Sequence, residues 1–117
     1  MVRVTSLLAQ GPGSPSGNTD IGLELNVKLT AQSHLDTHAY EADPRPWPVR
    51  RYWPDQPEWH GGLVALEEGW ALCSKDSGDN APLWALGARV FRPGEYITLR
   101  RPDGEELVFR IVNVEQD

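Results

Sequence analysis

Three residues in the segment HLDTH have side chains that commonly bind transition metals: His34, Asp36 and His38. If this segment is a β-strand, residues two apart project from the same face, so both imidazoles and the carboxylate lie together. Two imidazoles and one carboxylate with open coordination positions suit zinc or non-haem iron(II). His60 would complete the set and bring all three histidines of the chain into one site. The alternative is that these are polar residues on a solvent face, just past the end of a strand.

The segment DPRPWPVRRYWPDQPEWHGG, residues 43–62, holds five of the ten prolines and three of the five tryptophans of the chain. Its first prolines restrict the backbone and push the residues before them into extended geometry, so this part of the chain is stiff. A stiff, extended chain loses little entropy when it binds a partner. The residues that we expect to contact a ligand or partner are the aromatic and basic ones of this segment: Trp47, Arg50, Arg51, Tyr52 and Trp59.

The same rings can instead cover the sheet as a lid, because a chain this small needs its large apolar groups for its core. Trp47 stands between two prolines with only Val49 as an apolar neighbour, which favours an exposed or groove-lining ring. Tyr52 and Trp53 are adjacent in an extended run and point to opposite faces, and we expect Trp53 in the core. Trp59 precedes two glycines that let another chain approach closely, which favours the groove.

No catalytic signature is found outside these two segments. The serines occur in loop-type sequences and not in a strand–turn–helix elbow that would expose a nucleophile. Cys73 is the single cysteine, and its apolar neighbours in WALCS are typical of a small buried hydrophobic residue. The net charge of −6, from 17 acidic and 11 basic residues, argues against a duplex-nucleic-acid binder and against a protein held on an anionic membrane.

Alternating hydrophobicity is the main structural signal. In IGLELNVKLT, the residues Ile21, Leu23, Leu25, Val27 and Leu29 occupy one face and polar residues the other. This period of two is typical of a half-buried strand in an antiparallel sheet. The preceding residues 11–20 are turn formers, so we expect a flexible loop there between two strands.

The segment EYITLRRPDGEELVFRIVNVE predicts a hairpin, because Pro102, Asp103 and Gly104 suit a type I turn with the glycine at positive φ. The turn predicts four opposed pairs: Arg101 with Glu105, Arg100 with Glu106, Leu99 with Leu107, and Ile97 with Phe109. Towards the C-terminus both faces of the last strand become apolar, at Val108, Ile111, Val112 and Val114. We therefore expect this end to be covered by another layer or by another chain.

A short helix is predicted in DNAPLWALGA, where Asp79 or Asn80 can cap the start, Pro82 suits the first turn and Gly87 can end it. Together these elements predict a single mainly β domain over residues 1–117. Its fold would be a small antiparallel barrel or two-layer sandwich of about seven short strands with one short helix.

From these features we expect a bacterial, cytoplasmic binding or accessory module that acts without catalysis and without a cofactor. Its partner would be another protein, met through the aromatic and proline-rich surface, or a second copy met through the C-terminal strand. The alternative is a small zinc- or iron-dependent enzyme that uses the HLDTH segment. A cupin-like barrel would have the right size for it, although the glycine-rich His-x-His box of cupins is absent from the sequence.

Overall fold

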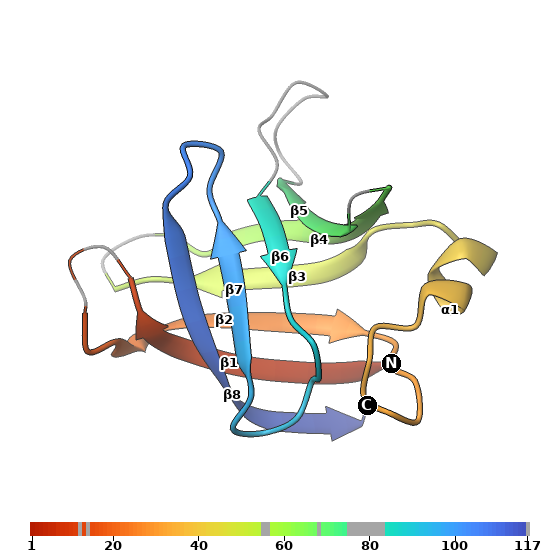
Figure 1. The fold of residues 1–117 in the computed structure, drawn as a ribbon, viewed down its shortest axis with the longest axis horizontal. Helices are drawn as coiled ribbons and strands as arrows, with labels where there is room; N and C mark the ends of the chain where they lie inside the picture. Colours follow the sequence, from red (N-terminus) through yellow and green to blue (C-terminus); the bar gives the residue numbers. More distant parts are fainter. Residues whose placement is uncertain (12, 14, 55–56, 68, 75–83, 117) are drawn as a thin grey trace.

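The computed structural model shows a closed barrel of eight antiparallel strands and one short helix (Figure 1). It describes all residues except 12, 14, 55–56, 68, 75–83 and 117. The elements in chain order are β1 (Val2–Gln10), β2 (Asn18–Val27), α1 (Thr37–Ala42), β3 (Trp47–Tyr52), β4 (Trp59–Leu66), β5 (Gly69–Ser74), β6 (Trp84–Gly87), β7 (Tyr96–Arg100) and β8 (Glu106–Gln116). Each strand pairs with its neighbour in sequence, and β8 returns to pair with β1. The predicted mainly β class and the barrel alternative are confirmed, with one strand more than expected.

The alternation in β2 is confirmed. Leu23, Leu25 and Val27 are fully buried and Ile21 nearly so, while the polar residues between them are more exposed. β2 lies between β1 and β3 in the barrel wall, so its apolar face looks into the interior. The strand begins at Asn18, so its first residues overlap the predicted loop 11–20.

The β7–β8 hairpin has the predicted register. Ile97 lies opposite Phe109, Leu99 opposite Leu107, and Arg100 opposite Glu106. The turn closes with a hydrogen bond from the Arg101 amide to the Glu105 carbonyl, at 2.8 Å. Turn chemistry and side-chain alternation act on the same few residues here, which is why the sequence determines this hairpin locally.

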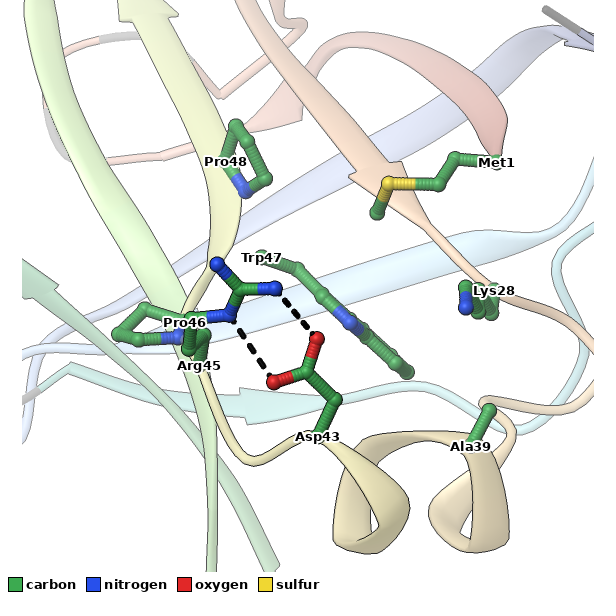
Figure 2. A pocket seen from close by; sticks show the side chains of 8 residues that line it. All are labelled: Met1, Lys28, Ala39, Asp43, Arg45, Pro46, Trp47 and Pro48. Carbon is green, nitrogen blue, oxygen red and sulfur yellow. Dashed lines mark hydrogen bonds and ion pairs between the residues drawn. The ribbon is translucent and has the colours of Figure 1, made fainter.

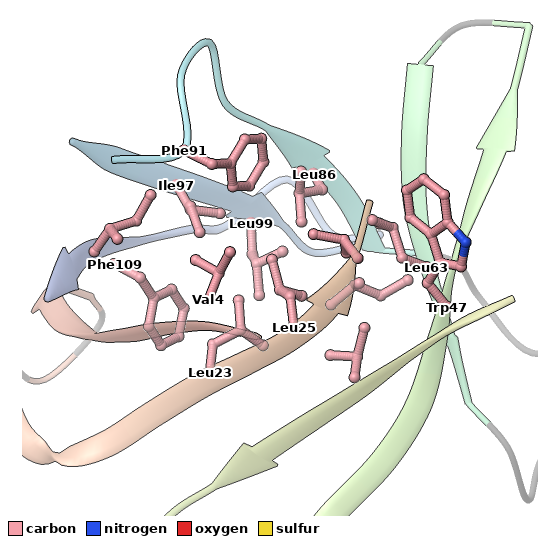
Figure 3. Close-up of a cluster of buried hydrophobic side chains, with 14 of the residues drawn as sticks. Val4, Leu23, Leu25, Trp47, Leu63, Leu86, Phe91, Ile97, Leu99 and Phe109 are labelled. Carbon is pink, nitrogen blue, oxygen red and sulfur yellow. The ribbon is translucent and has the colours of Figure 1, made fainter. Parts of the chain in front are cut away.

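The barrel interior is filled by aliphatic side chains and two phenylalanines from the inward faces of the strands and the β6–β7 connection (Figure 3). The fully or almost fully buried residues include Val4, Leu23, Leu25, Leu63, Leu72, Phe91, Ile97, Leu99, Leu107, Phe109 and Ile111. The interior is therefore a packed core, so a ligand would bind at the ends or on the outside of the barrel.

The predicted helix in DNAPLWALGA is wrong where the structure describes it, because residues 84–87 form strand β6; residues 79–83 lie outside the described residues. Trp84 and Leu86 face inward opposite Leu72 and Leu99, so pairing with two neighbouring strands outweighs a helix of two turns. The helix is instead α1, which falls on the HLDTH segment. No described helix has the length and apolar character needed to cross a membrane.

The two ends of the barrel differ. One end of the barrel is where the odd-numbered strands finish and the even-numbered strands start, and we name it the mouth. The opposite end carries the two termini and α1 (Figure 1). There Tyr40 of α1 packs edge-on against Trp47 and Trp70, with ring centroids 5.4 and 5.3 Å apart. These three rings close the end that bears α1.

Candidate functional site

The predicted metal ligands do not share a site in the structure. Asp36 is the N-cap of α1, and its carboxylate accepts a hydrogen bond from the Ala39 amide at 3.0 Å. His38 is inside the helix, so the strand that would place His34, Asp36 and His38 on one face is wrong. His60 lies on β4, where its Nε2 is 3.3 Å from a carboxylate oxygen of Glu58. Among the residues that the structure describes, no three metal-binding side chains come close enough to hold an ion.

Trp47 has only 6% of its surface exposed, so the expectation of an exposed ring is wrong, although the residue lines a pocket. Its place opposite Leu63 turns it into the barrel, where it stacks on Trp70 with centroids 5.2 Å apart. The burying partners come from β5 and α1, which lie outside the proline-rich segment 43–62, so its proline neighbours carry no information about them.

A pocket of about 280 Å³ lies beside Trp47 (Figure 2). It is lined by Met1, Lys28, Ala39, Asp43, Arg45, Pro46, Trp47 and Pro48. Arg45 donates two hydrogen bonds to the Asp43 carboxylate, at 2.9 and 2.6 Å, and holds the pKa of that carboxyl below its usual value. These two charges compensate each other, which leaves Lys28 as the other charged side chain of the lining.

Arg50 and Tyr52 belong to the outer face of β3. Arg50 donates hydrogen bonds to Glu24 at 2.9 Å and to Glu58 at 3.1 Å, and its guanidinium lies 5.4 Å from the ring centroid of Tyr52. Burial acts to lower the pKa of Arg50, but the hydrogen bond to Glu24 and the two negative charges outweigh it and raise the pKa. Arg50 is therefore neutralised within the chain.

Arg51, the next residue, points the other way. It lies opposite the fully buried Leu23 of β2 and opposite Trp59 of β4, so its side chain enters the barrel at the mouth. It follows the inward-facing Val49 by two positions, as strand alternation requires. An arginine thus occupies an interior position of the wall, just above the packed core.

Three indole rings surround the Arg51 guanidinium. Its central carbon is 4.5 Å from the ring centroid of Trp84, 4.9 Å from that of Trp53 and 5.4 Å from that of Trp59. All three rings are half-buried and pack against the core. Distances within 6 Å are those of favourable cation–π contacts, so the rings hold the guanidinium in place without neutralising it.

A second arginine approaches one of these rings. Arg101 follows the buried Leu99 by two positions, and its guanidinium carbon lies 5.1 Å from the ring centroid of Trp84. Arg101 donates one hydrogen bond to the Glu105 carboxylate at 3.4 Å. Its buried Nε atom, like that of Arg50, has no hydrogen-bond partner among the described residues. We name this group of five residues the Arg–Trp cluster: Arg51, Trp53, Trp59, Trp84 and Arg101.

The electrostatics of the Arg–Trp cluster are unbalanced. Burial lowers the pKa of Arg51, and the positive charge of Arg101 lowers it further. A guanidinium stays protonated at any physiological pH, so Arg51 keeps its charge despite this shift. Within the described part of the chain, no carboxylate pairs with Arg51. The cluster can therefore donate hydrogen bonds to an anion, but it contains no group that exchanges protons near neutral pH.

Part of this cluster was within reach of sequence reasoning. Arg51 and Trp59 are among the predicted binding residues, and Trp53 was expected in the core, which it borders. Trp84 and Arg101 were missed as site residues. Alternation with Leu86 and Leu99 indicates that both face inward, but only the closed barrel brings β6 and β7 next to β3.

Comparisons of the chain with protein-family models, with curated proteins and with solved structures find no match. Function is therefore inferred from the site itself.

Proposed function

We propose that this protein is a non-catalytic binding module that engages a protein partner through the Arg–Trp cluster at the mouth of the barrel. The observation that supports this most directly is the position of Arg51 and Arg101. Both point into the mouth, Arg51 among three indole rings and Arg101 over that of Trp84, and Arg51 has no carboxylate partner among the described residues. A chain with a net charge of −6 has many acids available for pairing, so an unpaired inward arginine indicates a role outside folding.

The chemistry of the cluster favours binding over catalysis. Arginine and tryptophan side chains supply hydrogen-bond donors and flat apolar surface, but neither acts as a nucleophile or as a general base at neutral pH. The same two residue types are enriched among the residues that dominate protein–protein binding energy. The metal-dependent enzyme gains no support, since the described histidines and Asp36 are not brought together.

The proposed binding surface keeps some of the binding residues predicted from the sequence and drops others. Arg51 and Trp59 stay in it, whereas Trp47 leaves it for the core. Arg50 and Tyr52 remain candidates for an outer rim, because both lie on the outside of β3. We place the module in the cytoplasm as part of the same proposal, since a single cysteine fits a reducing compartment.

Site-directed photo-crosslinking in the source cell tests this function. A benzophenone amino acid replaces Trp59 at the mouth or, as a control, the exposed Tyr96 on the outside of β7. We expect a discrete crosslinked protein from position 59 that is absent from position 96 and is lost when Arg51→Met is added. Crosslinks that are equal at both positions, or that persist in the Arg51→Met background, would contradict the proposal.

A further inference from the structure

We infer that the Arg–Trp cluster recognises the side-chain carboxylate of an aspartate or glutamate in an acidic segment of the partner. This inference rests on the proposed function and names the chemistry that the mouth accepts. Four features of the described structure support it: the charge of the cluster, the geometry of its donors, the closure of the barrel and the acids around the mouth.

The charge argument comes from two consecutive residues. Arg50 and Arg51 have the same side chain, but Arg50 donates to two carboxylates, whereas Arg51 faces three indoles and a second arginine. Arg101 is paired with Glu105 on one side, yet its charge still lowers the pKa of Arg51, so the two cations repel each other in the empty mouth. One negative charge placed between them removes that repulsion, so the mouth is complementary to an anion.

The donors favour a planar oxyanion. A guanidinium has five N–H groups in a fixed plane, which match the two oxygens of a carboxylate. The indole faces contact the guanidinium of Arg51 without offering it an oxygen acceptor, so its hydrogen-bonding capacity is unused within the described residues. A carboxylate arriving at the mouth would satisfy donors that the chain leaves unsatisfied.

The closed barrel limits how a partner can bind. Each strand pairs with two neighbours, including β1 with β8. Residues 113–116 of β8 pair with β1 but not with β7, and this free edge lies at the end of the barrel opposite the mouth. A peptide that extended this edge through backbone hydrogen bonds would lie away from the Arg–Trp cluster. We therefore assign recognition at the mouth to side chains, and the Arg–Trp cluster has side chains suited to a carboxylate.

The surroundings favour a single carboxylate over a phosphate group or a nucleic acid strand. Glu58 immediately precedes Trp59, and Asp103 and Glu105 lie in the turn that follows Arg101. These exposed acids, with the net charge of −6, repel a dianion or a polyanion more strongly than a monoanion. A partner segment with one or two acids presented to the mouth fits this pattern best.

An array of degenerate peptides tests the inference with defined probes. Each spot holds N-acetylated, C-amidated heptapeptides with one fixed central residue and random flanks, so that no terminal charge contributes. The fixed residues are Asp, Asn, Glu, Gln, phosphoserine, Leu and Trp, and a further set carries a free C-terminus. The full chain is used as probe, and the best peptides are then measured by isothermal titration.

We expect the Asp and Glu spots to bind the protein. The Asn and Gln spots should bind at least about tenfold more weakly, because a charged hydrogen bond is lost. Arg51→Met and Arg101→Met should each weaken the best acidic peptide by about tenfold or more. Arg100→Met is the matched control, since Arg100 is adjacent to Arg101 but points outward to Glu106. If Arg51→Met does not fold, the affinity of Arg51→Lys for the acidic peptide is measured instead. This variant keeps the charge but loses the planar set of donors, so it should also bind more weakly.

The other outcomes separate the two proposals. Preference for phosphoserine or for a free C-terminus would overturn the side-chain carboxylate. Preference for Leu or Trp, lost in Arg51→Met, would overturn the carboxylate and leave the binding module standing. No binding to any spot, together with no crosslink from position 59, would overturn both.

An acid of the same chain is the remaining alternative partner for Arg51. Asp55 follows Trp53 by two positions, Asp76 and Asp79 precede Trp84, and all three acids lie outside the described residues. The test replaces these three acids together by Asn. If this variant loses as much stability as Arg51→Met, and the combination of the two loses no more, Arg51 is paired within the chain and the inference is wrong. The expected result is that the Asn variant leaves peptide affinity and stability unchanged.

Discussion

Trp47 stacks on Trp70 with ring centroids 5.2 Å apart and an angle of 19° between the ring planes. Trp47 is in β3 and Trp70 in β5, so β4 separates them in the barrel wall. Tyr40 of α1 meets both rings edge-on, at 85° and 81°. The stacked pair and the edge-on ring are the two arrangements that aromatic groups prefer, so the end of the barrel that bears α1 is closed by specific contacts.

Trp47→Ala should therefore lower the free energy of unfolding by about 3 to 5 kcal/mol, the usual range for a buried tryptophan. Urea denaturation of the variant measures this loss. Tyr96→Ala is the matched control, because Tyr96 is 54% exposed on the outside of β7 and should cost little. A Trp47→Ala variant as stable as the Tyr96→Ala control would show that the aromatic trio does not close the barrel.

The burial of Trp47 illustrates what sequence reasoning could not reach. Flanking prolines correctly indicate an extended backbone at Trp47, which begins strand β3. They do not indicate which way the strand faces, because that depends on pairing with Leu63 and on the arrival of α1. The β7–β8 hairpin was predictable in full because its turn and its pairs all lie within a few residues of one another.

Gly104 sits in that hairpin turn with φ at +93°. Gly104→Ala should cost about 1 kcal/mol, because a Cβ is disfavoured at positive φ. Gly104→Asn is the comparison variant, since asparagine tolerates this conformation better and should cost less. Thermal unfolding of the two variants measures the difference, and equal losses would argue against a left-handed residue at position 104.

Asp36 gives a test that separates a helix cap from a metal ligand. Asp36→Ala should lower the free energy of unfolding by about 1 kcal/mol, because the Ala39 amide loses its acceptor. Asp36→Asn should retain most of the stability, since asparagine also caps helices well. A chelator should leave the melting temperature of untagged protein unchanged. Stoichiometric zinc or iron that is lost in Asp36→Asn would revive the metal site.

Glu115 and Arg3 form an ion pair of 2.7 Å across the β1–β8 seam, where they are directly opposed. The hydrogen bonds from Arg3 and Asn113, with the charge of Arg3, hold the pKa of Glu115 below its ordinary value of 4.5. Because the folded pKa is the lower one, this stabilisation is present above pH 4.5 and is lost as the pH falls through the folded pKa.

The stability gap between the natural chain and Glu115→Gln should accordingly be larger at pH 7 than below the folded pKa of Glu115. Urea titrations at several pH values measure it, and high salt should shrink it, because the pair is exposed. A gap that stays constant across this range would show that Glu115 does not contribute through its charge.

As with the hairpin and Trp47, the residues of the candidate site were predictable only where the evidence lies close together in the sequence. Arg51 and Trp59 could be picked out because aromatic and basic residues gather in one segment. Trp84 and Arg101 could not, since they are separated from that segment by at least 21 residues of chain and meet it only through β6 and β7. Strand alternation indicates an inward direction for each residue, but it does not say which inward residues become neighbours.

Gly22 and Tyr52 are directly opposed on β2 and β3, and a Cβ added to Gly22 would overlap the ring of Tyr52. Gly22→Ala should therefore destabilise the protein by about 1 kcal/mol, because the ring must move from its place over the glycine. In a Tyr52→Ala background the same change should be neutral or stabilising, since alanine suits a strand better than glycine once the ring is gone.

A double-mutant cycle read by urea denaturation measures this coupling between Gly22 and Tyr52. The matched control combines Gly22→Ala with Tyr96→Ala, whose effects should add, because Tyr96 lies on β7 and away from β2 in the barrel order. Additive effects in both cycles would mean that the Tyr52 ring does not rest on Gly22 in solution. The outer face of β3, with Tyr52 beside Arg50, would then be free to rearrange.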